Sequence, residues 1–199
     1  MPVISSALPS LPRSSLSKRL YIDPTCTGSQ NIAQNIATAS TMVTNAHSAV
    51  LNTNNNANDN DHFTFFFPSA SRAFVANIFA LSIHSFSFTD DATAGPLGTW
   101  TIECTPQAAQ QAECTNDPGA FYVPVEIEGG GLVAMETPIC APFWALPAAA
   151  PCGGLDKSMA LVLASAFRWG VPEPTVNYYM YYAQAVTLGC PVSAYGFLG

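Results

Sequence analysis

Six cysteines constrain the fold of this 199-residue chain more than any other feature. They stand at positions 26, 104, 114, 140, 152 and 190 and so cover most of the sequence. A structural zinc site needs ligand pairs two to four residues apart, and the closest two cysteines, Cys104 and Cys114, are ten residues apart. An even number of widely spaced cysteines indicates three disulfides, which six cysteines can form in 15 ways. Disulfides favour a secreted protein or a secretory compartment.

The composition excludes some partners. Only 10% of the residues are charged, 49% are apolar, and the net charge is −7, whereas an average domain has about 25% charged residues. Three of the six basic residues, Arg13, Lys18 and Arg19, lie in the first nineteen positions. We therefore expect no nucleic-acid partner and no anionic membrane surface, because both attract lysine and arginine. No run reaches the ~18 apolar residues of a membrane span.

The N-terminal region differs in composition from the rest. Residues 1–24 are rich in serine and proline, and 1–19 lack the apolar stretch of a signal peptide. We expect residues 1–20 to be a flexible arm or the remnant of a pro-segment, and residues 21–199 to form one domain. Lys18-Arg19 is either a processing site at the end of that pro-segment or part of a solvated arm, and both interpretations stay open.

Hydrophobic periodicity predicts a mainly helical α+β fold with a small antiparallel sheet. Four segments have helical spacing or helix-start signals: residues 27–51, 69–85, 155–169 and 174–188. Residues 99–104 form a short strand. Residues 120–127 and 132–136 alternate apolar and polar side chains around three glycines and predict a hairpin. The asparagine-rich stretch 52–61 predicts a loop, because asparagine and aspartate bond their own backbone.

Short pieces around the cysteines carry a family resemblance. They are Cys26-Thr27-Gly28-Ser29-Gln30, Cys114 with Asp117-Pro118-Gly119-Ala120-Phe121, Pro138-Ile139-Cys140-Ala141-Pro142-Phe143, Cys152-Gly153-Gly154 and the run Asn177 to Cys190. In this order they resemble the deuterolysins, or aspzincins, which are secreted fungal zinc endopeptidases. The resemblance implies a zincin-like fold and the disulfide pairs Cys26–Cys104, Cys114–Cys140 and Cys152–Cys190.

The chain departs from that family at the active site. The family's His-Glu-x-x-His motif would fall about eleven residues past Cys152, where two histidines bind zinc and the glutamate activates water. This chain has Leu163 and Phe167 at the ligand positions and Ala164 at the position of the base. The segment that carries the family's third ligand, an aspartate, is missing from residues 168–174. The resemblance therefore implies a pseudo-metallopeptidase with no catalytic residue, metal or cofactor, whose former cleft Leu163 and Phe167 close against Tyr179 or Tyr182.

The three histidines do not share a sequence motif. His47 lies on the apolar stripe of the first predicted helix, which is typical of a core or boundary histidine. His62 ends the asparagine-rich segment, so we expect it to be solvated. His84 has no partner at metal-binding spacing.

Acidic residues offer weak alternatives. The 52–61 segment has oxygen ligands for calcium, but it lacks the glycine and glutamate of a hand-type loop in register. Glu126 and Glu128 share one face of a strand, which is more typical of a solvated surface than of acid–base catalysis. Asp90 and Asp91 are expected to form a turn or helix cap.

Aromatic residues gather in two places. Tyr178, Tyr181 and Tyr182 share a helix face, and a second group precedes the 69–85 helix: Phe63, Phe65, Phe66 and Phe67. If these rings are exposed, they indicate binding of a sugar, lipid or protein. The commoner alternative is core packing beneath Trp144 and Trp169.

These features favour a non-enzymatic fungal protein on a metalloprotease-like scaffold, with a storage, fruiting-body or defence role. The alternative is a secreted binding protein or effector that holds a protein or small molecule in the former substrate groove. A residual hydrolase is a third hypothesis, which the lack of a nucleophile elbow or phosphate loop disfavours. Oligomeric state cannot be inferred from these patterns.

Overall fold

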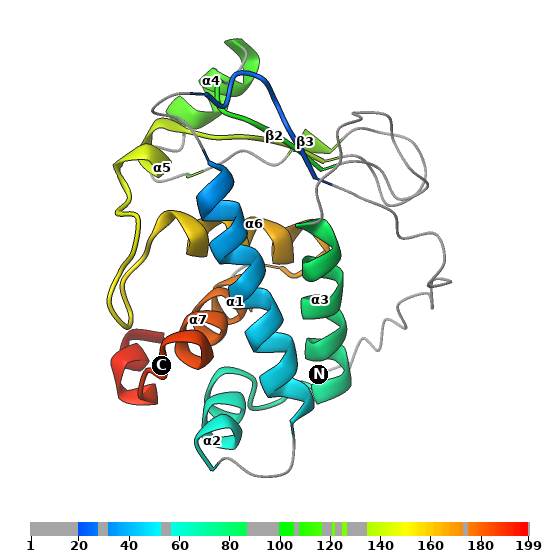
Figure 1. Ribbon diagram of the computed structural model, residues 1–199, viewed down its shortest axis with the longest axis vertical. Helices are drawn as coiled ribbons and strands as arrows, with labels where there is room; N and C mark the ends of the chain where they lie inside the picture. Colours follow the sequence, from blue (N-terminus) through cyan, green and yellow to red (C-terminus); the bar gives the residue numbers. More distant parts are fainter. Residues whose placement is uncertain are drawn as a thin grey trace.

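The computed structural model describes residues 20–27, 32–52, 57–86, 100–105, 108–116, 121, 125–126, 135–172 and 175–198. The fold is mainly helical and carries a small sheet at one end (Figure 1). The helices are α1 (Ala33–Leu51), α2 (Ala57–Phe66), α3 (Arg72–Ser85), α4 (Ala108–Asn116), α5 (Ala141–Ala145), α6 (Lys157–Arg168), α7 (Thr175–Leu188) and the 3₁₀ helix η3 (Val192–Leu198). The strands are β1 (Leu20–Ile22), β2 (Trp100–Glu103), β3 (Val125–Glu126) and β4 (Met135–Pro138).

The sheet has the strand order β1-β2-β4-β3, and most of it is parallel. β1 pairs with β2, and β2 pairs with β4, in parallel registers such as Leu20↔Trp100 and Trp100↔Met135. The expectation of an antiparallel sheet is therefore wrong for these three strands. Alternation along a strand shows which faces are buried but not which way the neighbouring strand runs, and the long α1–α3 crossover permits parallel pairing of β1 and β2.

The hairpin expected over residues 120–127 and 132–136 is not confirmed. Of the described residues in its first segment, Val125–Glu126 form a strand, which pairs antiparallel with β4 through Val125↔Glu136. The three glycines expected to form its turn lie outside the described residues.

β1 was not predicted. The expected N-terminal arm ends at residue 20, where Leu20 is fully buried and pairs with Trp100. The Asp23 N–H donates to the Ile102 carbonyl at 2.9 Å and extends the contact past the strand. A three-residue strand is too short to show a recognisable alternation, so only its tertiary partner reveals it.

The predicted long helices exist with shifted ends. α1 begins at Ala33 rather than residue 27, and α3 begins at Arg72 rather than residue 69. Ser71 caps α3, because its side-chain oxygen accepts the Phe74 N–H at 3.1 Å. α6 and α7 agree with the predicted closing pair, 155–169 and 174–188, to within two residues at each end.

The asparagine-rich stretch is the largest error in secondary structure. Residues 57–61, expected in a loop, form the start of α2. Further along this helix Phe63 and Phe66 are buried against α7. Tertiary burial of these rings outweighs the low helix propensity of asparagine and aspartate. α4, which carries Cys114, was also not predicted.

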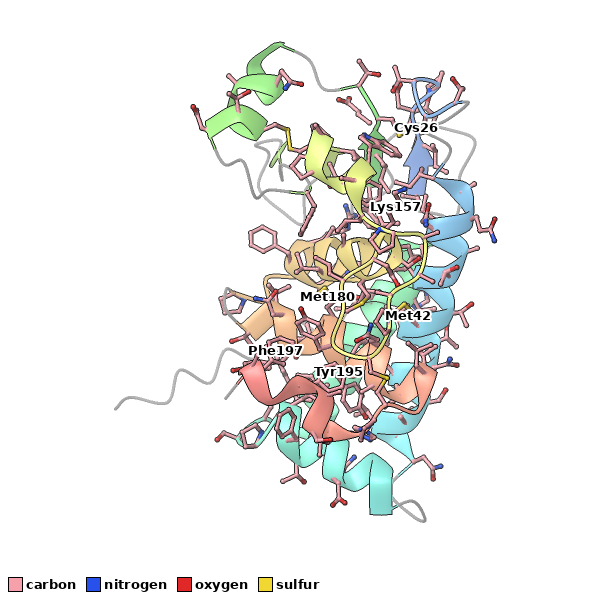
Figure 2. The ribbon with its side chains drawn as sticks, turned by 90° about the vertical axis from the view of Figure 1, so that its left-hand side faces the viewer. Cys26, Met42, Lys157, Met180, Tyr195 and Phe197 are labelled. Carbon is pink, nitrogen blue, oxygen red and sulfur yellow. A yellow bond between two sulfur atoms is a disulfide. The ribbon has the colours of Figure 1, made fainter. Side chains whose placement is uncertain are left out.

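The helices form layers beneath the sheet. α6 lies between the sheet end and α7, while α2 and η3 lie at the opposite end (Figures 1 and 2). α1 runs along the molecule and packs on α3, α6 and α7. Trp100 anchors the sheet end, because it is fully buried and its Nε1–H donates to Thr137 Oγ1 at 2.8 Å.

All six cysteines are paired, as Cys26–Cys104, Cys114–Cys140 and Cys152–Cys190. These are the pairs that the family resemblance implied. The first joins the ends of β1 and β2, the second joins α4 to the end of β4, and the third joins the loop before α6 to the end of α7. Three disulfides are compatible with a secreted protein. No helix among the described residues is long and apolar enough to cross a membrane.

Candidate functional site

The central helix α6 carries the positions at which the family resemblance would place a zinc motif. Asp156 starts this helix, because its Oδ1 accepts the Met159 N–H at 2.9 Å while its Oδ2 accepts the Ala150 N–H at 3.1 Å. Gly170, at φ +76°, ends it in the left-handed conformation that glycine adopts without strain. Both ends of α6 are therefore specified locally.

The face of α6 that carries these positions is apolar. Ala164 is fully buried, and Leu163 and Phe167 are half-buried and pack on the core. None of these three side chains has an atom that binds zinc or accepts a proton, so this face does not fit the family's metal. Most other α6 positions are buried, which makes the Leu163–Phe167 edge one of the more open parts of the helix.

Tyr179 and Tyr182, the expected partners of this face, are buried on α7. Within the described residues their rings pair with four phenylalanines, at centroid distances of 4.9–6.4 Å: Phe63, Phe66, Phe67 and Phe79. Phe167 is not one of these ring partners. The ring pairs do not describe the contacts of Leu163, so the predicted closure of the α6 face by Tyr179 or Tyr182 stays a prediction.

The aromatic residues mainly form core, as the commoner alternative held. Phe63, Phe66 and Phe67 are buried, Tyr178 and Tyr181 are half-buried, and Phe65 is 38% exposed. Trp144 and Trp169, beneath which these rings were expected to pack, contact other residues. Trp144 pairs with Phe143, and the Trp169 Nε1–H donates to Ser85 Oγ at 2.8 Å.

The structure separates the three histidines. His47 is half-buried on α1, where burial lowers the pKa of its imidazole. His84 lies in the last turn of α3. His62, expected to be solvated, is only 7% exposed, and its Nε2 lies 2.6 Å from the Cys190 carbonyl oxygen. The reason for this error is again α2, which turns the end of the supposed loop toward α7.

Most of the acidic candidates lie outside the described residues. Glu126 lies in β3, while Glu128, Asp90 and Asp91 lie outside the described residues, as does part of the proposed calcium loop. In the part of the chain that the structure describes, no group of three or more His, Cys, Asp or Glu side chains could hold a metal ion.

Gln184 is a polar centre that sequence reasoning missed. It is fully buried on α7, and its Oε1 accepts the Gly153 N–H and the Tyr195 hydroxyl, each at 3.0 Å. Its Nε2 donates to the carbonyls of Pro151 at 3.1 Å and Gly154 at 3.0 Å. The amide thus joins the Cys152 loop, α7 and η3. The sequence signal that could have identified this buried polar residue is a single glutamine within a largely apolar helix.

Gly153 is required at the centre of this junction. Its φ is +77°, and a Cβ at this position would lie 2.6 Å from the Ala194 carbonyl oxygen. Only glycine suits this close approach between the Cys152 loop and η3. The Cys152-Gly153-Gly154 piece was one of those that carried the family resemblance. Close packing against η3 is a separate reason for the glycine at position 153.

Neither a protein-family model nor a curated protein sequence matches the chain.

Proposed function

We propose that this protein is a secreted, catalytically inactive relative of the deuterolysin-type endopeptidases, with a zincin-like scaffold and a non-enzymatic role. Storage, fruiting-body and defence roles are its first candidates. The ordered cysteine pieces and the three disulfide pairs support the relationship. The observation that carries the proposal is the α6 face, where half-buried Leu163 and Phe167 stand at the positions of the two histidine ligands and buried Ala164 stands at the position of the base.

Rebuilding the motif tests this proposal. The variant Leu163→His/Ala164→Glu/Phe167→His restores two ligands and the base but not the third ligand. We expect the native protein to contain no stoichiometric zinc, and the triple variant to be less stable and to cleave no peptide. The instability should come mainly from a glutamate at the fully buried Ala164. Ala37→Glu, on the exposed face of α1, is the matched control and should leave stability nearly unchanged.

Stoichiometric zinc in the native protein, with peptide cleavage that a chelator abolishes, would overturn the proposal. A rebuilt variant with chelator-sensitive cleavage would show instead that a third ligand survives and that catalysis was lost through the α6 positions alone.

A binding protein or effector is the second candidate, and one observation favours it. Leu163 and Phe167 leave part of an apolar helix face open, which suits a protein or small-molecule ligand in the former groove. Phe167→Ala should then lower the free energy of unfolding by only about 1 kcal/mol. Buried Phe79 is the matched control, and Phe79→Ala should lower it by about 3–5 kcal/mol. Equal losses in urea denaturation would mean a closed face and would count against this candidate.

Abundance separates the two roles. A storage protein should be plentiful in the tissue that makes it and fall when nutrients are withdrawn, whereas the level of a binding protein should not follow nutrient supply.

A further inference from the structure

The three disulfides differ in how open they are to solvent. Cys152 is exposed, whereas its partner Cys190 is only 1% exposed. Of the other four cysteines, one is half-buried and three are buried: Cys26, and then Cys104, Cys114 and Cys140. Access is one of the factors that set how fast an external thiolate attacks a disulfide, and exposed disulfides are the labile ones. Cys152–Cys190 is therefore the disulfide most open to a thiol from solution.

Cys190 is fixed at the buried side of this disulfide. Its N–H donates to the Ala185 carbonyl at 2.9 Å, just past the end of α7. Its carbonyl oxygen lies 2.6 Å from His62 Nε2 on α2, and since a carbonyl only accepts hydrogen bonds, Nε2 is the donor. Neither contact uses the Cys190 sulfur. Opening the disulfide therefore leaves the backbone of Cys190 with its partners.

The exposed side is also held without the sulfur atoms. Gln184 accepts the Gly153 N–H and donates to the carbonyls of Pro151 and Gly154, so it bonds the chain on both sides of Cys152. Gly153 also packs closely against the η3 backbone, in the part of the molecule where Tyr195 is labelled in Figure 2. The two sulfur-bearing segments should therefore stay together as a dithiol, ready to close again.

We propose that Cys152–Cys190 is an exchangeable disulfide, and that Cys152 is the site at which a low-molecular-weight thiol such as glutathione becomes attached. The thiolate of glutathione forms a bond to Cys152 Sγ while the bond to Cys190 Sγ breaks. The bonding electron pair goes to Cys190 Sγ, which takes up a proton from water. This step uses neither α6 nor a metal, so it is separate from the inactive motif positions.

A second thiolate completes the reduction. It attacks the glutathione sulfur of the mixed disulfide, releases Cys152 as a thiolate and leaves as oxidised glutathione. The protein disulfide is thereby reduced and glutathione is oxidised. Oxidised glutathione drives the same steps in reverse and closes the disulfide again.

Peptide mapping of the intact, folded protein tests the proposal. After incubation with reduced glutathione and an acid quench, N-ethylmaleimide should label Cys190 first, and the mass of glutathione should appear on Cys152. The other two disulfides should still be closed at that time. S-Methylglutathione has no thiol and should produce no labelling.

Two single substitutions compare the two sulfurs. In Cys190→Ser, the exposed Cys152 should take up one glutathione from oxidised glutathione. In Cys152→Ser, the remaining Cys190 is buried and must wait for local opening, so it should react about tenfold more slowly or less. Near-ultraviolet circular dichroism shows whether each variant is folded, and the mapping of the native protein is decisive even if one of them is not.

Hydrogen exchange tests whether the dithiol form stays assembled. In protein reduced with glutathione, the Gly153 amide should remain protected, because Gln184 still accepts its hydrogen bond.

Three results would overturn the proposal. They are earlier opening of either of the other disulfides, attachment of glutathione to Cys190 rather than Cys152, and no exchange until urea unfolds the protein. Loss of Gly153 protection on reduction would overturn it too, because the disulfide would then open only by local unfolding.

Discussion

At the sheet end of the molecule the strands are two to four residues long, whereas at the opposite end α2, α7 and η3 bury a continuous group of rings. Two of the three disulfides, Cys26–Cys104 and Cys114–Cys140, tie the chain at the ends of the short strands. The third, Cys152–Cys190, lies beside the fully bonded Gln184. We infer that disulfides stabilise the sheet end, where short strands form few backbone hydrogen bonds, and that side-chain packing stabilises the helical end.

Removing one disulfide from each end gives the largest effect and tests this contrast. Loop-closure entropy assigns about 4.5 kcal/mol to Cys26–Cys104, with a separation of 78, and about 4 kcal/mol to Cys152–Cys190, with a separation of 38. We expect the free energy of unfolding of Cys26→Ala/Cys104→Ala to fall by most of the roughly 4.5 kcal/mol assigned to this disulfide. The free energy of unfolding of Cys152→Ala/Cys190→Ala should fall clearly less than that of the first variant, because the Gln184 hydrogen bonds still hold residues 151–154 to α7. Urea denaturation compares the two, and a larger loss at the helical end would refute the contrast.

Truncating a ring at the helical end should have the next largest effect. Phe66 is 1% exposed and contacts the rings of Tyr182 and Tyr195 at 5.9 and 5.1 Å. Phe66→Ala should lower the free energy of unfolding by about 3–5 kcal/mol, because it leaves a cavity among rings that cannot collapse fully. Its neighbour Phe65, at 38% exposed, is the matched control and should lose about 1 kcal/mol. Similar losses for both would mean that α2 is not anchored by Phe66.

Gln184→Met should have a smaller effect. Methionine keeps the volume but leaves the Pro151 and Gly154 carbonyls, the Gly153 N–H and the Tyr195 hydroxyl without their partner. We expect a loss of about 2–3 kcal/mol, measured by thermal or urea denaturation. Gln34→Met, on the exposed face of α1, should change stability by about 0.5 kcal/mol or less. A neutral Gln184→Met would show that the disulfide alone positions the Cys152 loop.

High pH should lower the stability of the protein through Tyr195, which lies at the helical end. Burial raises the pKa of Tyr195 to about 12, while a tyrosine in the unfolded chain ionises near 10. The folded state therefore keeps the proton longer, so this contribution is complete below about pH 10 and is lost as the pH rises toward 12. Denaturation midpoints across this range should fall.

Tyr195→Phe is the control for the pH effect. Its midpoint should fall less steeply, although still measurably, because burial also raises the pKa of Tyr181. An unchanged slope would mean that Tyr195 does not contribute to the loss.

Some of this architecture could be predicted from local patterns. Ile36, Val43 and Val50 lie on one buried face of α1, as their spacing indicated, and β2 falls within the predicted strand. The lack of zinc ligands on α6 could also be predicted, because the sequence shows directly that positions 163, 164 and 167 hold no histidine or glutamate. In each case the signal is carried by neighbours in the chain.

The candidate site was less predictable for a physical reason. The sequence alone established a disulfide-rich, mainly helical chain whose Leu163, Ala164 and Phe167 cannot bind zinc. Only the tertiary structure decided the parallel course of β1, β2 and β4, the helix at 57–66 and the burial of His62 and Gln184. These features depend on partners many residues away, such as Cys190 for His62 and Gly153 for Gln184. Local propensity contains no information about such partners, and the free energy of burying them exceeds the propensity it overrides.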